Sequence, residues 1–175
     1  MESFSTCDFC DAYKGDDGDA SGSGAFRVLP GGALRSYGGV ERFAGPVSTV
    51  KCFEDNSLVK AAVESAGRGR VLVVDGGGSL RRALLGGNLA AAAARNGWAG
   101  LLIDGCVRDL AELRAAATGI LARAHVPLPT ERRGQGLADL PVQVFGVTLR
   151  PGDWLYADAD GVVVSASALH LPRAS

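Results

Sequence analysis

Two short segments of the chain combine residue types that could hold a small anion. The first is Gly86-Gly87-Asn88-Leu89, which directly precedes a strongly helix-forming, alanine-rich stretch that ends at Arg95. The unpaired N–H groups of a helix N-terminus converge, and the helix dipole stabilises a carboxylate placed there. A glycine-rich helix entry without a ligand explains these residues equally well. On these residues alone, both interpretations stay open.

The second segment is the pair Arg108-Asp109, which follows an apolar stretch and the turn at Gly105. We expect the pair to begin a helix, where Asp109 could be no more than a favourable N-terminal charge. Arg108 is harder to explain, because a cation near a helix N-terminus is disfavoured. An anionic ligand would compensate this placement. Both segments follow expected strands, so we expect them to open on the same edge of the sheet, where α/β proteins usually bind ligands.

Two other motifs give weaker signals. Gly76-Gly77-Gly78 follows a buried apolar run but matches neither a phosphate-binding loop nor a dinucleotide fingerprint, so we interpret it as a tight turn. Cys7 and Cys10 form a C-x-x-C, but a structural zinc site needs two more ligands, and the sequence offers no second cysteine pair or histidine cluster. One face of a short N-terminal helix is the better interpretation of these two cysteines.

The segments that must position these residues alternate between strand and helix patterns. Strand–helix–strand order favours a parallel-leaning α/β core, whereas strands joined by tight turns are antiparallel by default. The helix from Ser57 is expected to place Leu58, Ala61, Ala62 and Ser65 on one face, with Ser57 available as a cap. The expected core elements are strand Phe43–Cys52, helix Ser57–Ala66, strand Arg70–Val74, helix Leu89–Arg95, strand Gly100–Ile103, helix Val107–Ala117 and strand Gly119–Ala124, followed by strands Val142–Leu149, Trp154–Ala157 and Val162–Ser165. This order predicts an α/β fold, a layered sandwich with a mixed sheet.

Length and composition limit the class of protein. The 175 residues predict a single domain over 1–175, with a flexible Gly/Ser/Asp-rich loop at 14–24. A formal net charge of −1 argues against a broad nucleic-acid-binding surface, which needs an excess of Lys and Arg. The sequence has no apolar run of about 18 residues and no signal-peptide pattern near its N-terminus, so we expect a soluble cytoplasmic protein without a membrane partner.

Three segments resemble one known family in particular. DGGGSLRRALLGGNLA (75–90), NGWAGLLIDGCVRD (96–109) and PGDWLYADADGVVVS (151–165) are similar to the family of the regulator of ribonuclease E activity A and the 4-hydroxy-4-methyl-2-oxoglutarate aldolases. TCDFCDAY (6–13) and FAGPVSTVKCFEDNSLV (43–59) resemble it more weakly. The resemblance implies an α/β/β/α sandwich that assembles as a homotrimer with active sites between subunits.

The resemblance also implies a site and a reaction. Backbone amides of Gly86, Gly87, Asn88 and Leu89 would bind a 2-keto acid, and Arg108 would contact its keto and carboxylate oxygens. Asp109 would anchor Mg²⁺ or Mn²⁺, largely through water. The implied reaction is metal-assisted cleavage of 4-hydroxy-4-methyl-2-oxoglutarate to pyruvate, with oxaloacetate decarboxylation as a side activity through the same enolate. Water on the metal would carry the proton, because neither His125 nor His170 lies in the matched segments.

Alternatives remain beside this interpretation. Longer aldolases of the family carry a C-terminal extension that supplies an acidic residue to a neighbouring subunit, and this chain stops at Ser175. A Schiff-base aldolase would have to use Lys14, Lys51 or Lys60. A non-enzymatic regulator of a ribonuclease or RNA helicase is the second class of function. Asp109 discriminates, because members that act only as regulators can lack it and a binding role alone has no use for a metal-anchoring carboxylate.

Overall fold

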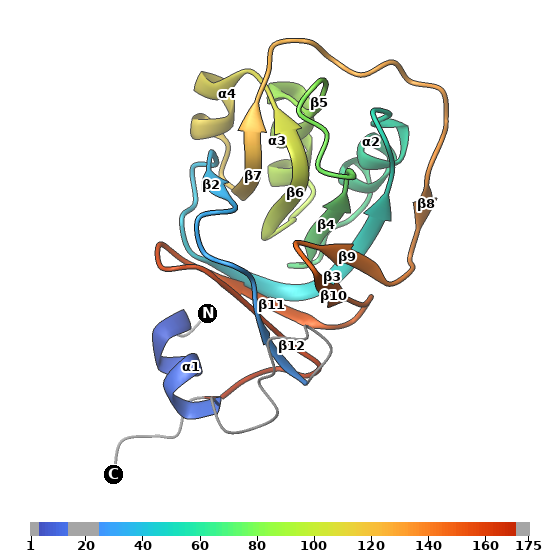
Figure 1. Ribbon diagram of the computed structural model, residues 1–175. Helices are drawn as coiled ribbons and strands as arrows, with labels where there is room; N and C mark the ends of the chain where they lie inside the picture. The colour runs from blue at the N-terminus through green and yellow to red at the C-terminus, as the bar shows by residue number, and fades with distance from the viewer. Residues whose placement is uncertain (1–3, 14–24, 171–175) are drawn as a thin grey trace.

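The structure, a computed structural model, describes residues 4–13 and 25–170. Its central feature is a mixed sheet with the strand order β1-β12-β11-β3-β4-β6-β7-β2, with β5 and β8 attached at its side (Figure 1). The helices are α1 (Thr6–Tyr13), α2 (Ser57–Glu64), α3 (Gly87–Arg95) and α4 (Leu110–Ala115). The strands are β1 (Phe26–Val28), β2 (Arg35–Ser36), β3 (Phe43–Lys51), β4 (Val71–Asp75), β5 (Ala83–Leu85), β6 (Gly100–Val107), β7 (Gly119–His125), β8 (Leu137–Ala138), β9 (Val142–Val144), β10 (Val147–Leu149), β11 (Trp154–Ala157) and β12 (Val162–Ser165).

One strand, β3, belongs to two parts of the sheet. Its first half pairs antiparallel with β11, from Phe43 to Pro46, and its second half pairs parallel with β4, from Val47 to Lys51. Strands β4, β6 and β7 continue the parallel part. The carboxyl ends of β3, β4, β6 and β7 therefore meet at one edge of the sheet. Arg108-Asp109 follows β6, and the Gly86–Leu89 turn follows β5, which pairs parallel with the end of β6.

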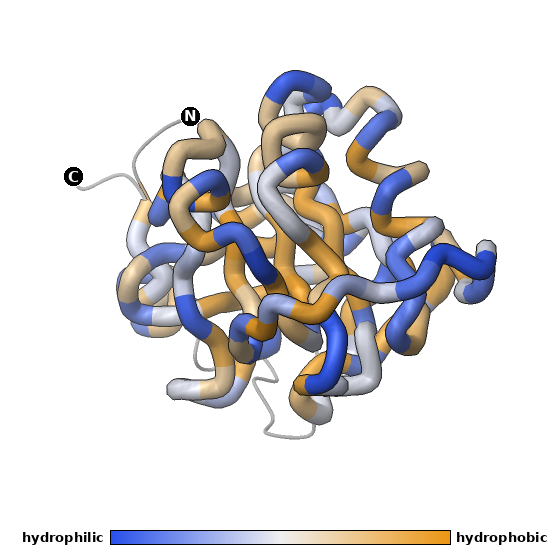
Figure 2. The backbone as a smooth tube through the Cα atoms, turned by 90° about the horizontal axis from the view of Figure 1, so that it is seen from above, coloured by the Kyte–Doolittle hydropathy of each residue, from blue (hydrophilic) through white to orange (hydrophobic). Residues whose placement is uncertain are grey.

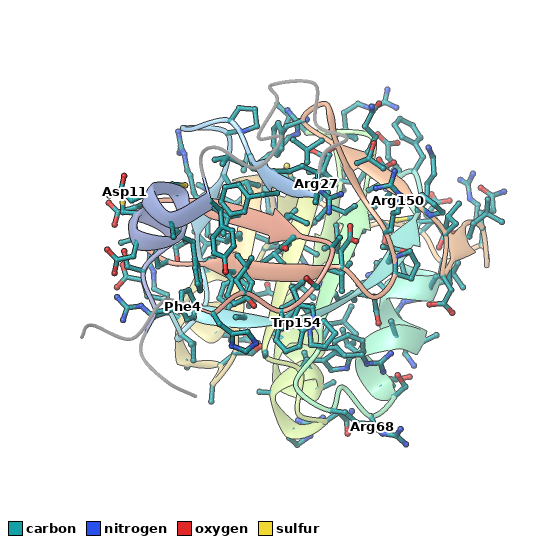
Figure 3. The ribbon with its side chains drawn as sticks, turned by 90° about the horizontal axis from the view of Figure 1, so that it is seen from below. Phe4, Asp11, Arg27, Arg68, Arg150 and Trp154 are labelled. Carbon is teal, nitrogen blue, oxygen red and sulfur yellow. The ribbon has the colours of Figure 1, made fainter. Side chains whose placement is uncertain are left out.

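The layers are those of an α/β/β/α sandwich. Helices α2, α3 and α4 pack on one face of β4 and β6 through a core that includes Val63, Ala93 and Leu113. The other face packs against β9 to β12, through a second core that includes Val73 and Leu155. A third, aromatic cluster joins α1 to the outer side of β11 and β12, and Figure 3 labels two of its members, Phe4 and Trp154. Figure 2 shows the apolar segments gathered inside and the polar ones around the periphery. The predicted fold class is confirmed.

Several predicted bounds were wrong in informative ways. Strand β6 continues through Asp104 to Val107, because the Asp104 carboxylate is paired with Arg123 on the adjacent β7 and so remains in the buried strand. Helix α4 begins only at Leu110. The expected strand Val142–Leu149 is a hairpin of β9 and β10, because Phe145 and Gly146 both take positive φ in a tight turn.

The face predicted for the helix after β3 was half right, and its predicted cap was wrong. Leu58 and Ala62 pack half-buried against the core, but helix α2 buries Val59 and Val63 more deeply, and Ala61 and Ser65 are exposed. The β-branched valines carry more apolar area onto the sheet than the alanines do. Asn56, not Ser57, is the N-cap.

The loop predicted at 14–24 lies outside the described residues. Within the residues that the structure describes, no helix has the length and apolar character needed to cross a membrane.

Candidate functional site

A cleft of about 400 Å³ opens at the carboxyl edge of the parallel strands. It is bounded by the turn before α3, the segment between β6 and α4, the residue before α2 and the connection after β7. Its lining residues are Asn56, Ala83, Gly86, Asn88, Leu89, Arg108, Asp109, Pro129, Thr130 and Arg132. The two segments singled out in the sequence therefore share one cleft.

Gly87 is the predicted site residue that does not line this cleft. Its backbone N–H donates instead to Oδ2 of Asp109, at an N···O distance of 3.1 Å. The N–H of Leu89 lies 3.1 Å from the carbonyl oxygen of Gly86. Among the described residues, the N–H groups of Gly86 and Asn88 have no hydrogen-bond partner, so both amides of this turn remain available to a ligand.

Asp109 adopts a left-handed backbone conformation, with φ 60° and ψ 51°. Such a conformation costs a non-glycine residue energy, although Asp tolerates it better than most, and it recurs at functional sites. Because a residue in this conformation does not continue a helix, α4 begins after Asp109. The prediction that Arg108 lies within a helix was therefore wrong. Arg108 instead joins β6 to α4, and its N–H donates to the carbonyl of Leu85 at 2.9 Å.

The side chains of Arg108 and Asp109 lie next to each other at the mouth of the cleft. Nε of Arg108 is 3.5 Å from Oδ2 of Asp109, and the two side chains are 39% and 38% exposed. Oδ2 of Asp109 is thus engaged twice, by Arg108 and by Gly87, whereas Oδ1 has no recorded partner within the described part of the chain. One carboxylate oxygen is fixed, and the other remains available to an incoming group.

The far wall of the cleft is formed by residues that no sequence motif indicated. Nε of Arg132 donates to Oδ1 of Asn56 at 3.3 Å, and Nδ2 of Asn56 donates to the carbonyl of Leu84 at 3.1 Å. The hydroxyl of Thr130 is buried without a hydrogen-bond partner among the described residues. The cleft is lined by two guanidinium groups, those of Arg108 and Arg132, and by one carboxylate, that of Asp109. This excess of positive charge suits an anionic ligand. The 126–136 connection shows neither helical nor strand periodicity, so no sequence pattern placed it here.

Other residues considered for chemistry lie elsewhere. His125 packs edge-on against Tyr37, and the backbone of His170 bonds to Tyr13, and neither histidine lines the cleft. Lys51 pairs with Asp75 at 3.3 Å, and Lys60 pairs with Glu64 at 2.6 Å. These positions do not support a Schiff-base lysine.

The described residues contain no group of three or more His, Cys, Asp or Glu side chains that could hold a metal ion. Cys7 and Cys10 are free thiols on α1, Cys7 exposed and Cys10 half-buried. A cation at Asp109 would consequently need most of its ligands from water, from a bound substrate or from another subunit.

Gly86 provides a test of how closely this cleft is packed. A Cβ atom at Gly86 would lie 2.6 Å from Oδ2 of Asp109 and 3.2 Å from Nε of Arg108. We therefore expect Gly86→Ala to displace both side chains. Since small displacements of site groups can cost about 10²-fold in rate, kcat/KM for a substrate bound in this cleft should fall by about that factor. Gly161→Ala is the matched control, because a Cβ there meets nothing within 4 Å. Equal steady-state kinetics for the two variants would contradict the described packing.

Comparison with known proteins identifies the family of this chain. Residues 6–164 match the RraA-like family, described as Aldolase/RraA. A protein of Albidiferax ferrireducens with the provisional name 4-hydroxy-4-methyl-2-oxoglutarate aldolase is 66% identical, over 95% of this chain and 98% of its own length. A Burkholderia multivorans protein with the same provisional name is 57% identical, with the same coverage. The solved structure of the RNA-processing inhibitor RraA from Thermus thermophilis is 44% identical, covers 99% of both chains and superposes with a TM-score of 0.88. The chain therefore belongs to the RraA-like family.

Proposed function

We propose that this chain is a lyase that cleaves 4-hydroxy-4-methyl-2-oxoglutarate to pyruvate with the help of Mg²⁺ or Mn²⁺, and that it decarboxylates oxaloacetate as a side activity. The observation that carries the proposal is the convergence of Arg108, Asp109 and the Gly86–Leu89 turn in one cleft. The provisional names of two close relatives support the aldolase reaction.

The donor set fits a hard divalent cation. Such cations prefer carboxylate oxygen and keep several waters, and Asp109 offers one free carboxylate oxygen at the mouth of the cleft. Gly87 and Arg108 hold the other oxygen of Asp109, so the carboxylate is oriented before any ion binds. A bound cation would supply Lewis-acid polarisation of a keto group.

The chain's own residues would do the remaining work. Cleavage of the C3–C4 bond, one carbon removed from the keto carbon, leaves the electron pair of that bond as pyruvate enolate, with negative charge on the keto oxygen. The other fragment leaves as a second pyruvate once the 4-hydroxyl has lost its proton, or as CO2 when the substrate is oxaloacetate. The Arg108 guanidinium would stabilise that oxygen, and it is fixed near the cleft before the reaction, which is what electrostatic stabilisation requires. The free N–H of Asn88 would hold the substrate's first carboxylate. Arg132 and Thr130 face the same space from the opposite wall and would receive a second carboxylate, which both proposed substrates carry.

The direct test is pyruvate release from oxaloacetate and from 4-hydroxy-4-methyl-2-oxoglutarate, coupled to NADH oxidation. We expect turnover with Mg²⁺ or Mn²⁺, loss of turnover after EDTA treatment, and recovery when excess metal is added. Turnover that is insensitive to EDTA would contradict the metal requirement. Absence of turnover on both substrates would favour the regulator function.

That second function has its own support. The 44% identical Thermus thermophilis protein is titled an RNA-processing inhibitor. Phe53, Leu80 and Leu128 are each at least half exposed, and each follows the carboxyl end of a parallel strand, so apolar surface adjoins the cleft. Such surface would suit a ribonuclease or helicase partner, or the neighbouring subunits of a homotrimer. Light scattering of the purified protein, alone and with a candidate ribonuclease, separates the two uses. We expect a cytoplasmic trimer.

A further inference from the structure

The connection between β7 and β8 crosses the carboxyl edge of the sheet, and Figure 1 shows it as the long orange segment above β5 and α2. We call residues 126–136 of it the strap. The strap contributes Pro129, Thr130 and Arg132 to the cleft. The described backbone contacts of the strap with β5 and β6 lie in its first half: the N–H of Val126 donates to the carbonyl of Val107, and Pro129 forms a bridge with Ala83. Something other than a sheet ladder must therefore fix the position of its second half.

The side chain of Asp55, which is 1% exposed, makes that connection. Its Oδ2 accepts hydrogen bonds from the backbone N–H of Arg133 at 2.7 Å and of Gln135 at 3.2 Å. Its Oδ1 accepts the N–H of Ser57, the first residue of α2, at 2.8 Å. Hydrogen bonds to an ionised acceptor are about twice as strong as neutral ones. One buried carboxylate thus joins the strap to α2.

The charge state of Asp55 agrees with this role. Burial by itself raises the pKa of this carboxyl group, but the hydrogen bonds from Ser57, Arg133 and Gln135 outweigh it and lower the pKa to about 2. The group is ionised at neutral pH and accepts all three N–H groups as an anion.

The side chains of the strap alternate between two spaces. Thr130 and Arg132 line the cleft, whereas Glu131, Arg133 and Gln135 line a neighbouring hollow of about 300 Å³ that also contains Asp55. Asp55 therefore binds the backbone N–H of Arg133, the residue directly after Arg132, and the side chain of Arg132 lines the cleft. Oδ1 of Asn56, the neighbour of Asp55, accepts a hydrogen bond from Nε of Arg132.

We propose that Asp55 is a positioning residue that holds the strap so that Arg132 and Thr130 can bind the distal carboxylate of a dicarboxylic 2-keto acid. The substrate class in this proposal rests on the proposed function, whereas the positioning role does not. Asp55 touches no ligand itself. It acts through the backbone of the strap, and the groups that would bind the pyruvyl half, Arg108 and Asp109, have no contact with it among the described residues.

The test compares oxaloacetate, which carries a distal carboxylate, with pyruvate, which lacks one. Asp55→Asn keeps the shape of the side chain but loses its charge and turns an acceptor into a donor opposite an N–H group. We expect KM for oxaloacetate to rise about tenfold without a fall in kcat, because the distal carboxylate leaves as CO2 and a contact to it stabilises the bound substrate rather than the transition state. The dissociation constant of pyruvate, measured by calorimetry with Mg²⁺ present, should stay unchanged. Glu131→Gln is the matched control, because Glu131 lies on the same strap and forms its ion pair with the Arg133 side chain, not with Asp55 or a residue of the cleft.

A second readout follows the strap without activity. In Asp55→Asn, the Arg133 and Gln135 amides should exchange with deuterium faster, and trypsin should cleave after Arg132 and Arg133 sooner, than in the wild type. Ser57→Ala, which removes the hydroxyl that accepts the N–H of Gly134 at 3.0 Å, should do the same more weakly and serves if Asp55→Asn does not fold.

The outcomes separate the two proposals. An equal loss of pyruvate and oxaloacetate binding would show a merely structural role and overturn the inference, as would unchanged amide exchange. If the wild-type protein binds no pyruvate, the proposed function is wrong, and the substrate class that depends on it is wrong as well. Faster amide exchange in Asp55→Asn would even then support the positioning role.

Discussion

Replacing Arg108 by alanine is expected to lower kcat/KM for oxaloacetate and 4-hydroxy-4-methyl-2-oxoglutarate by about 10³-fold, the effect of removing a preorganised donor to a developing oxyanion. The guanidinium is the charge nearest to Asp109 in the cleft, at 3.5 Å, and its backbone is fixed by the hydrogen bond to Leu85. Steady-state kinetics of pyruvate release measure the loss. Stability should change little, since the side chain is 39% exposed.

Two further variants make this result specific. Arg108→Lys keeps the charge but loses the planar, two-pronged geometry of a guanidinium, so we expect it to recover only a small part of the activity. Arg114→Ala, on the exposed side of α4, removes an equal charge away from the cleft and should leave the kinetics intact. An Arg108→Ala enzyme with activity like that of Arg114→Ala would remove Arg108 from the reaction.

The second large effect is expected at Asp109. Asp109→Ala should abolish metal-stimulated turnover, with a loss of about 10³-fold, because the cleft then has no carboxylate to hold a cation. Alanine is poorly suited to φ 60°, so this variant should also lose about 1–2 kcal/mol of stability. Activity with and without Mg²⁺, together with thermal unfolding, measures both effects, and light scattering should still report the assembly of the wild type.

Asp109→Asn separates the charge from the backbone conformation. Asparagine tolerates the left-handed region, and its amide oxygen can still accept the N–H of Gly87, but it carries no negative charge. We expect wild-type stability with activity as low as in Asp109→Ala, and weaker Mn²⁺ binding by electron paramagnetic resonance. Unchanged Mn²⁺ affinity in both variants would place the cation elsewhere.

Much of the fold could be predicted from local patterns. Continuous apolar runs identified β4, half of β6 and most of β7, and tight turns identified the β11–β12 hairpin. The errors arose where a partner distant in the sequence decides the structure. Asp104 and Gly105 look like a turn, but Arg123 on the neighbouring strand neutralises Asp104 and keeps it in β6. Short strands such as β1 and β5 exist only through their pairing, so periodicity could not reveal them.

The candidate site was half predictable for the same reason. Arg108-Asp109 follows the recognisable strand β6, so its position at the sheet edge could be inferred. The Gly86–Leu89 turn follows β5 and could be recognised only by its glycines and the alanine-rich helix after it, and the structure places both segments in one cleft. Asn56 looked like an ordinary residue before a helix. Thr130 and Arg132 lie in a segment without periodicity, and they reach the cleft because Asp55 binds the backbone beyond them. That tertiary contact joins positions far apart in the chain, and no local pattern encodes it.

The division of β3 between two partners has a consequence for folding. The antiparallel half needs β11, about a hundred residues later in the chain, whereas the parallel half needs only β4. We infer that the parallel half, with its shorter loop to close, assembles first and presents the free first half of β3 as a template for the later strands. Since both layers are built on a single continuous strand, neither can melt without exposing the other, and the described domain should unfold in one cooperative step.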